Sequence, residues 1–145
     1  MSAPFGDLVP TEDHGPLLPA SAGIGVTSMP AMLSHLAASG ATRPVTVVHA
    51  DRDPASHAHR REQLDLIREL PDARLHLWYE EPGDQAPEAS AGHADIAGLA
   101  LPAGLTVRLC GPLPFMRAVR GGLLRRGVPA AASHWESRTG VRPLR

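Results

Sequence analysis

Short apolar runs recur along the chain and are separated by longer polar or amphipathic segments. The runs occupy 17–21, 45–50, 75–79, 105–110 and 131–136. The second run is rich in β-branched residues, as in strands that a sheet buries on both faces, and in the third run apolar and polar side chains alternate. The pattern predicts five strands.

Between these runs, apolar residues recur at spacings of three and four positions, which is typical of amphipathic helices. We expect helices over 29–39, 54–70, 95–100 and 115–126. Asp53 followed by a proline is a typical start for the second helix, and Gly127 is a typical end for the last. Because strands and helices alternate, the sequence predicts an α/β fold: an open, parallel five-stranded sheet with helices on both faces, in three layers.

Such a sheet binds its ligands beyond the carboxyl ends of the strands, near the point where the strand order reverses. Three segments follow strand ends in this way, at 21–27, 49–53 and 110–116. A chain of 145 residues is the size of one domain, which we expect over residues 16–145. Residues 1–15 show no periodicity and are interpreted as a lead-in.

Charge and composition exclude several classes of function. The chain has 14 Lys and Arg against 15 Asp and Glu, a formal net charge of −1, so neither a nucleic acid nor an anionic membrane is expected as a partner. No apolar run is long enough to span a bilayer, and the first residues lack a secretory signal. The single cysteine, Cys110, excludes an internal disulfide and fits a reducing compartment, so we expect a soluble, cytoplasmic protein.

Two glycines separated by one residue follow the first strand. Gly23 and Gly25 allow positive φ and a close approach of a ligand to the backbone. The helix expected from Met29 points its first N–H groups at the same place. The segment predicts a phosphate site, although it lacks the third glycine of the dinucleotide fingerprint and similar turns occur without a ligand.

Other reactive residue types have structural interpretations. His49, at the end of a buried strand, is interpreted as a hydrogen-bonded core residue rather than a general base. His57 and His59 are expected on the charged second helix with diverging side chains and no partner at ligand spacing, so no metal site is predicted. The arginine pairs at 60–61 and 125–126 are interpreted as solvated helix faces. Cys110 fits either a small buried residue or, from its place before Gly-Pro, a binding site.

Four segments together resemble the pyridine-nucleotide domain of the ferredoxin reductase superfamily, and most closely the reductase half of bacterial flavohaemoglobins. They are 21–27, 44–53, 78–82 and 109–116. The first is similar to the family's S-A-G-x-G-x-T phosphate loop, and the last to its C-G-P-x-x-F-M segment. The resemblance covers about residues 16–137 and implies a Rossmann-like fold of ferredoxin reductase type, with the lead-in resembling the exit from a flavin-binding barrel.

The resemblance implies roles for the matching positions. The backbone around Gly23, Gly25 and Val26, with the Thr27 hydroxyl, would hold the pyrophosphate of NAD(P)H at the start of a helix.

At the second strand end, Asp51 would accept hydrogen bonds from the adenosine ribose, whereas Arg52 would reach the ribose or a phosphate on it. An acid repels a 2′-phosphate and an arginine attracts one, so both cannot be optimal at once. We favour NADH over NADPH.

At the fourth strand end, Cys110 and Gly111 would lie against the nicotinamide, with Pro112 and Met116 in the start of the helix behind them. Glu136, in a segment similar to the family's H-Y-E, would lie beside flavin and nicotinamide. Cys110 and Glu136 are therefore the candidate catalytic residues, and their task would be to fix distance and orientation.

The resemblance thus implies an NAD(P)H-binding oxidoreductase domain that delivers hydride to FAD, in a flavohaemoglobin-like nitric oxide dioxygenase or a related flavin reductase. This length leaves no room for a flavin barrel or a globin, so FAD is expected only where a longer chain or partner supplies the barrel. Pro19 in the first strand and Arg138, where the family has an aromatic residue, depart from the pattern. A catalytically silent relic or interaction domain therefore stays open, as does another phosphate ligand.

Overall fold

The computed structural model describes residues 15–23, 29–84, 89–129, 132–137 and 140–143. In this part of the chain, seven strands form one sheet in the order β4-β3-β2-β1-β5-β6-β7. The strands are β1 (Leu17–Ala22), β2 (Val45–Asp51), β3 (Ala73–Tyr79), β4 (Ser90–Ala91), β5 (Thr106–Cys110), β6 (Ser133–Ser137) and β7 (Gly140–Pro143). All neighbours pair in parallel except β6 and β7. The expected parallel five-stranded sheet is confirmed, and two short edge strands that the sequence analysis missed, β4 and β7, extend it.

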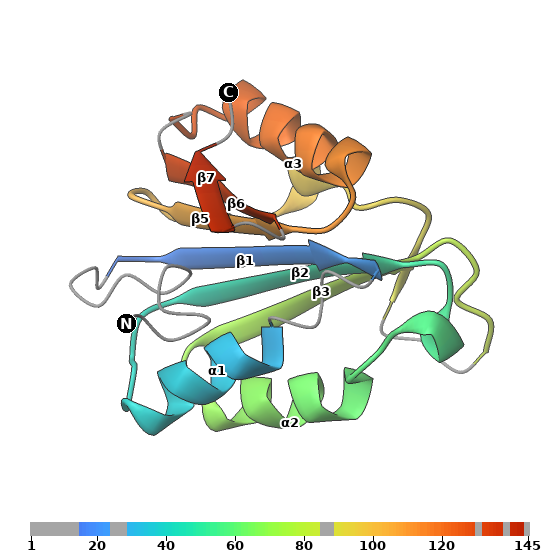
Figure 1. Ribbon diagram of the computed structural model, residues 1–145, viewed down its shortest axis with the longest axis horizontal. Coiled ribbons are helices and arrows are strands. Elements are labelled where there is room, and N and C mark those ends of the chain that lie inside the picture. Colours follow the sequence, from blue (N-terminus) through green and yellow to red (C-terminus); the bar gives the residue numbers. More distant parts are fainter. Residues whose placement is uncertain (1–14, 24–28, 85–88, 130–131, 138–139, 144–145) are drawn as a thin grey trace.

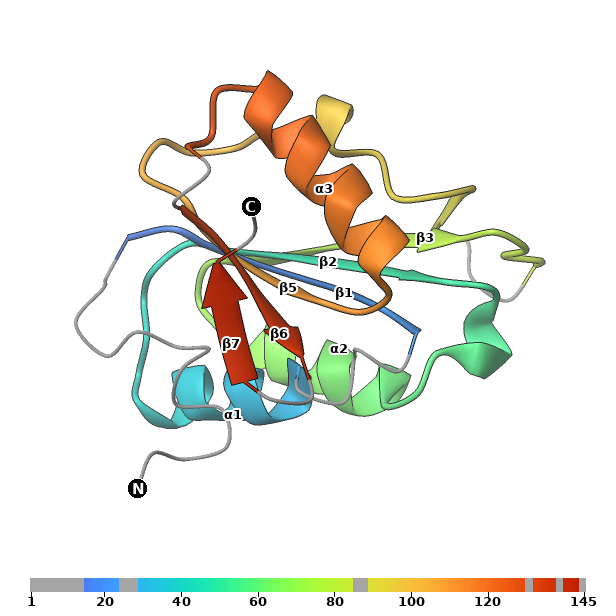
Figure 2. The same ribbon diagram turned by 45° about the horizontal axis from the view of Figure 1, so that its top comes forward.

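Helices cover both faces of the sheet, as expected. In Figure 1, α1 (Met29–Ala38) and α2 (Arg60–Glu69) lie on one face, and α3 (Leu113–Arg125) lies on the other. The turned view in Figure 2 shows the same three layers, with the short 3-10 turn η3 (Ile96–Gly98) beside α3.

The core consists of two apolar layers, one on each face of the central strands. Leu17 and Val47 pack under α1 and α2, whereas Leu18 and Val48 pack under α3, and all four are fully buried. Successive side chains of a strand point to opposite faces. A strand covered on both sides must therefore be apolar throughout, which explains the continuous apolar runs in the sequence.

Pro19 lies in the middle of β1, the central strand, where a missing N–H is unusual. The pairing of β1 with β5 is continuous from Leu17 to Ser21. The pairing with β2 skips Leu18 and Pro19 and resumes at Ala20. The sheet thus accommodates the proline by a local interruption on one side of β1.

The second helix begins later than expected. Asp53 caps only a 3-10 turn, η2 (Pro54–Ser56), in which its Oδ1 accepts from the Ser56 N–H at 2.8 Å. His59 then has φ of 58°, in the left-handed region, and α2 starts at Arg60. The prediction from residue 54 was wrong because the capping signal of Asp53 is the same for a single turn and for a helix.

Arg126 also differs from the sequence interpretation. Its Nη1 donates to the Ile96 carbonyl at 2.8 Å and to the Leu99 carbonyl. Arg126 therefore ties the end of α3 to η3 and is more than a solvated charge.

Candidate functional site

The carboxyl ends of β1, β2 and β5 lie side by side at one edge of the sheet. Ser21 of β1 is paired with His49 of β2 on one side and with Cys110 of β5 on the other. The chain leaves β1 toward β2 and β3 and then returns to the opposite side of β1 as β5, so the strand order reverses here. A cavity of about 550 Å³ opens at this edge, between the strand ends, the start of α3 and residues 92–94. We call it the carboxyl-edge cavity.

Four of the residues predicted to bind a nucleotide line the carboxyl-edge cavity together, namely Gly23, Asp51, Arg52 and Pro112. They come from three strand ends that are far apart in the sequence. Met116, predicted for the same site, lies instead in the core beneath α3 and is 2% exposed. Its side chain supports α3 and does not line the cavity.

The two candidate catalytic residues are neighbours along the backbone of the sheet. Cys110, which is partly buried at the end of β5, pairs in register with Ser21 on one side and with Glu136 of β6 on the other. Cys110 is not among the residues that line the cavity. The remaining predicted residues, Gly25, Val26 and Thr27, lie outside the described residues.

Sequence reasoning missed part of the lining. Glu80 follows β3 directly and lies in the segment 78–82, but no binding role was predicted for it, although its position at a strand end is a usable signal. His93 follows β4, a strand of two residues that no apolar pattern indicates. Phe115, which the sequence analysis placed only in the expected helix over 115–126, lines the cavity from α3.

Gly111 is required by a close approach of two backbone segments. Its φ is +146°, a conformation that other residues rarely adopt. A Cβ at this position would lie 3.0 Å from the Ala22 carbonyl oxygen and 3.2 Å from the Ala22 nitrogen. The exit of β5 can therefore pass against the exit of β1 only because residue 111 has no side chain.

The start of α3 faces the carboxyl-edge cavity. Pro112 is the N-cap residue, and its carbonyl accepts from the Met116 N–H at 3.1 Å. Pro112, Pro114 and Phe115 line the cavity. The first turn of a helix presents unpaired N–H groups and the positive end of the helix dipole, which favour an anion.

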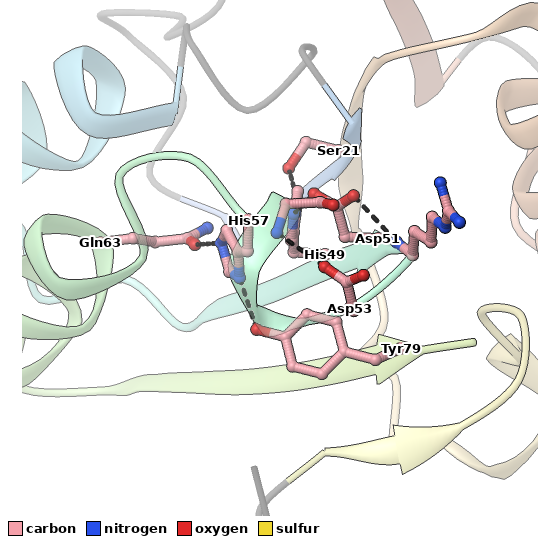
Figure 3. Close-up of polar contacts among 9 residues, drawn as sticks. Ser21, His49, Asp51, Asp53, His57, Gln63 and Tyr79 are labelled. Atoms are coloured by element: carbon pink, nitrogen blue, oxygen red, sulfur yellow. Dashed lines mark hydrogen bonds and ion pairs between the residues drawn. The ribbon is translucent and has the colours of Figure 1, made fainter. Parts of the chain in front are cut away.

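A buried polar network lies behind the cavity, at the ends of β1, β2 and β3 (Figure 3). The Ser21 hydroxyl is 2.8 Å from His49 Nδ1, and His49 Nε2 is 3.3 Å from Asp51 Oδ2. His49 is fully buried. Burial, together with the adjacent His57 ring, lowers the pKa of His49 to about 4. The structure thus gives His49 polar partners in the core, as the sequence interpretation expected.

His57 belongs to the same network, which corrects its expected place on the charged helix. It follows η2, stacks on His49 with ring centroids 3.9 Å apart, and lies 2.6 Å from the Tyr79 hydroxyl through Nδ1. Its Nε2 is 2.8 Å from Gln63 Oε1. Burial lowers the pKa of His57 below its usual value. His59 is exposed, so the two histidines diverge, as expected, but for a different structural reason.

The charges at the mouth of the cavity have both signs. Arg52 is exposed, and its backbone N–H donates to Asp51 Oδ1 at 2.9 Å. Glu80 Oε1 and His93 Nε2, which also line the cavity, are 3.7 Å apart. The cavity can therefore present a cation to a phosphate and carboxylates to hydroxyl groups.

A glycine that allows close approach, a helix start, and an acid beside an arginine at a reversal of strand order define an α/β dinucleotide-binding domain. Residues 20–121 match the family described as "Oxidoreductase NAD-binding domain". The chain belongs to this family. Among the described residues, no helix is long and apolar enough to cross a membrane.

Its relatives include flavohemoproteins. The chain is 39% identical over 144 residues to the flavohemoprotein of Chromobacterium violaceum, covering 94% of this chain and 35% of the relative. It is 39% identical over 137 residues to the flavohemoprotein of Deinococcus radiodurans, covering 88% of this chain and 33% of the relative. The chain therefore spans about a third of the length of these relatives.

Solved structures agree with this assignment. A flavohemoglobin from Malassezia yamatoensis, with bound FAD and heme, superposes with a TM-score of 0.77 at 34% identity, over 86% of this chain and 32% of that one. The FAD/NAD-binding domain of nitric oxide dioxygenase from Vibrio cholerae gives a TM-score of 0.79 at 32% identity, over 86% of this chain and 52% of that one. The cytochrome b5 reductase domain of Ulva prolifera nitrate reductase, at 20% identity and a TM-score of 0.70, shares the fold. The expected resemblance to ferredoxin reductases and flavohaemoglobins is confirmed.

Proposed function

We propose that this chain binds NADH in the carboxyl-edge cavity and presents the nicotinamide to a flavin held by another domain. One observation carries the proposal: Gly23, Asp51, Arg52 and Pro112, from three separate strand ends, line one cavity where the strand order reverses. Family membership supports a nicotinamide dinucleotide over other phosphate ligands.

The pyrophosphate would lie between the turn after β1 and the start of α3. Gly23 has φ of +56° and lines the cavity. The first turn of α3 can offer the N–H groups of Leu113 and Phe115 to an anion, because Pro112 and Pro114 carry none. Gly25, Val26 and Thr27 would complete this phosphate site. Met116 would act indirectly, by packing α3 onto the sheet.

The adenosine ribose would lie at the end of β2. Asp51 would accept hydrogen bonds from its hydroxyl groups, and the exposed Arg52 would neutralise a nearby phosphate. A 2′-phosphate lacks one of these hydroxyl donors and repels the Asp51 carboxylate. We therefore infer a preference for NADH over NADPH.

The nicotinamide would lie near the ends of β5 and β6. Gly111, which lacks a side chain that would collide with Ala22, lets the exit of β5 pass close to the exit of β1 beside Cys110. Cys110 and Glu136, paired in register, would fix which face of the nicotinamide ring is presented to the flavin and how deeply the ring lies at the sheet edge. The bound nicotinamide supplies the hydride, and the protein supplies distance and orientation.

The electron acceptor would be FAD in a barrel domain, with a globin domain as a further partner. The relatives are about three times as long as this chain, and one solved relative carries FAD and heme. We infer that nitric oxide dioxygenation or a related flavin-dependent reduction is the activity of the assembled protein. We propose a cytoplasmic location.

Calorimetric titration of the purified chain with NADH and NADPH tests the binding proposal. We expect one saturable site with tighter binding of NADH, and the absence of heat with both nucleotides would overturn the proposal. Reduction of ferricyanide by NADH, with and without added FAD, tests turnover. A chain that binds NADH but transfers no electrons, even with a barrel domain added, would support the alternative of a catalytically silent domain.

A further inference from the structure

The Asp51 carboxylate is held by two hydrogen bonds that do not use all of its acceptor sites. Oδ1 accepts from the Arg52 backbone N–H at 2.9 Å, and Oδ2 accepts from His49 Nε2 at 3.3 Å. Each carboxylate oxygen has two acceptor sites, so each oxygen of Asp51 keeps one. Asp51 lines the carboxyl-edge cavity with a side chain that is 8% exposed. The two remaining acceptor sites match the number of hydroxyls on an unmodified ribose.

The partners of His49 determine which of its nitrogens carries the proton. The Asp51 carboxylate can only accept, so His49 Nε2 carries the hydrogen and donates it. Burial and the His57 ring lower the pKa of His49 to about 4, so the ring is neutral and Nδ1 is an acceptor. The Ser21 hydroxyl, 2.8 Å away, therefore donates to Nδ1. A directed chain of hydrogen bonds runs from Ser21 on β1 through His49 to Asp51.

The ring of His49 is also fixed by packing. His57 stacks on it, with the ring planes inclined by 30°. His57 in turn contacts the Tyr79 hydroxyl and Gln63, and the side chains of Tyr79, Gln63 and His49 are fully buried. A close-packed ring does not change rotamer at little cost. The orientation of the Asp51 carboxylate is therefore set before any ligand arrives, which saves ordering entropy on binding.

We propose that His49 is a positioning residue that fixes the Asp51 carboxylate for the two hydroxyls of the adenosine ribose, and thereby makes the site selective for NADH over NADPH. This inference rests on the proposed function. A fixed carboxylate cannot turn away from a 2′-phosphate, so NADPH meets a negative charge at Asp51 even with the Arg52 side chain nearby. Without its bond to His49, the carboxylate can turn toward solvent or toward the Arg52 side chain, and the selectivity falls.

Two amide substitutions at residue 49 separate this role from general support of the fold. In His49→Gln, the longer side chain carries an N–H donor to about the place of the imidazole Nε2 and still reaches Asp51. In His49→Asn, the amide reaches only the place of Nδ1, near Ser21, and leaves Asp51 without that donor. The two variants have similar polarity, so they form a matched pair.

We expect His49→Asn to weaken NADH binding about tenfold and His49→Gln to weaken it less than about threefold, from the loss or retention of one charge-assisted hydrogen bond. NADPH binding should change less than about threefold in both variants. Equal losses of NADH and NADPH affinity in both variants would overturn the inference. Ser21→Ala removes only the donor to His49 Nδ1. It should reduce the preference for NADH over NADPH, as His49→Asn does, but by a smaller factor. It provides the test if His49→Asn does not fold.

A measurement without nucleotide makes the two proposals distinguishable. The Arg52 backbone N–H donates to Asp51 Oδ1, so its amide proton resonance reports the position of that carboxylate. We expect this resonance to shift in His49→Asn and to stay in place in His49→Gln. An unshifted Arg52 amide in His49→Asn would overturn the positioning role. A native chain that binds neither nucleotide would overturn the proposed function and the selectivity, while the Arg52 amide would still decide whether His49 holds Asp51.

Discussion

The two edges of the sheet each hold a cavity, and the two cavities are nearly equal in size. The carboxyl-edge cavity measures about 550 Å³, and a second one at the amino ends of β2 and β3, the amino-edge cavity, measures about 590 Å³. The amino-edge cavity has charged residues too, among them Asp72 and Arg74. Among the residues that the structure describes, its lining contains no helix start and no glycine with positive φ. Volume and charge do not identify the site, whereas the backbone at the strand ends does.

The largest effect that separates the two edges should come from glycine substitutions. Gly111→Ala combines an unfavourable φ with a Cβ 3.0 Å from the Ala22 carbonyl oxygen. We expect it to lower the free energy of unfolding by about 3 kcal/mol and to abolish measurable NADH binding. Chemical denaturation and calorimetry provide these values.

The matched control lies just before β5, near the amino edge. Gly104 has φ of +76°, but a Cβ there meets no atom within 4 Å. Gly104→Ala should therefore cost only about 1 kcal/mol of strain and leave NADH binding intact. Equal costs for the two substitutions would contradict the close approach of β5 and β1 as the reason for Gly111.

The second effect is a pH dependence of stability that originates at the carboxyl edge. The pKa of His49 falls from 6.5 to about 4 on folding, so between these values the unfolded state binds more protons than the folded state. The free energy of unfolding should rise with pH through this window, and about 3 kcal/mol should be lost when the pH falls from 7 to 4. Burial also lowers the pKa of His57, which acts in the same direction. Denaturation curves across this range test the expectation.

The amino edge again offers a control. Burial, with Arg74 nearby, lowers the pKa of the half-buried His76 as well. His49→Gln should flatten most of the pH dependence, whereas His76→Gln should change it little because His76 is closer to solvent. A larger flattening in His76→Gln would mean that the stacked pair of His49 and His57 is not the main acid-sensitive element.

The smallest effect concerns one exposed cation at each edge. Arg52→Ala should weaken NADPH binding by about three- to tenfold and NADH binding by less, since an exposed charge pair contributes little. Arg74→Ala removes another exposed cation, from the amino-edge cavity, and should leave both affinities unchanged. Parallel losses in both variants would indicate a general electrostatic attraction instead of a contact at Arg52.

The length of each element explains whether the sequence predicts it. The five long strands and three helices follow from apolar periodicity, because each buries a face large enough to leave a pattern. β4 has two residues and β7 has four, too few for a period to emerge. η2 and α2 were merged because the left-handed turn at His59 has no strong sequence signal.

The site was only partly predictable for a related reason. Gly23, Asp51 and Pro112 each follow a strand, so their meeting at one edge follows from parallel topology. The stack of His57 on His49 depends on how η2 folds back over β2, which no local pattern encodes. The polar core behind Asp51 could therefore be found only in the folded chain.

The central claim is that a nicotinamide dinucleotide binds at the carboxyl edge. Backbone amide resonances of the labelled chain, followed during a titration with NADH, test it most directly because both edges are observed at once. We predict saturable shifts at 22–23, 50–52, 92–94, Gly111, Leu113 and Phe115, with the resonances of 45–46, 72–76 and 98–101 unchanged. Shifts confined to the amino edge, or no shifts at saturating NADH, would contradict the claim.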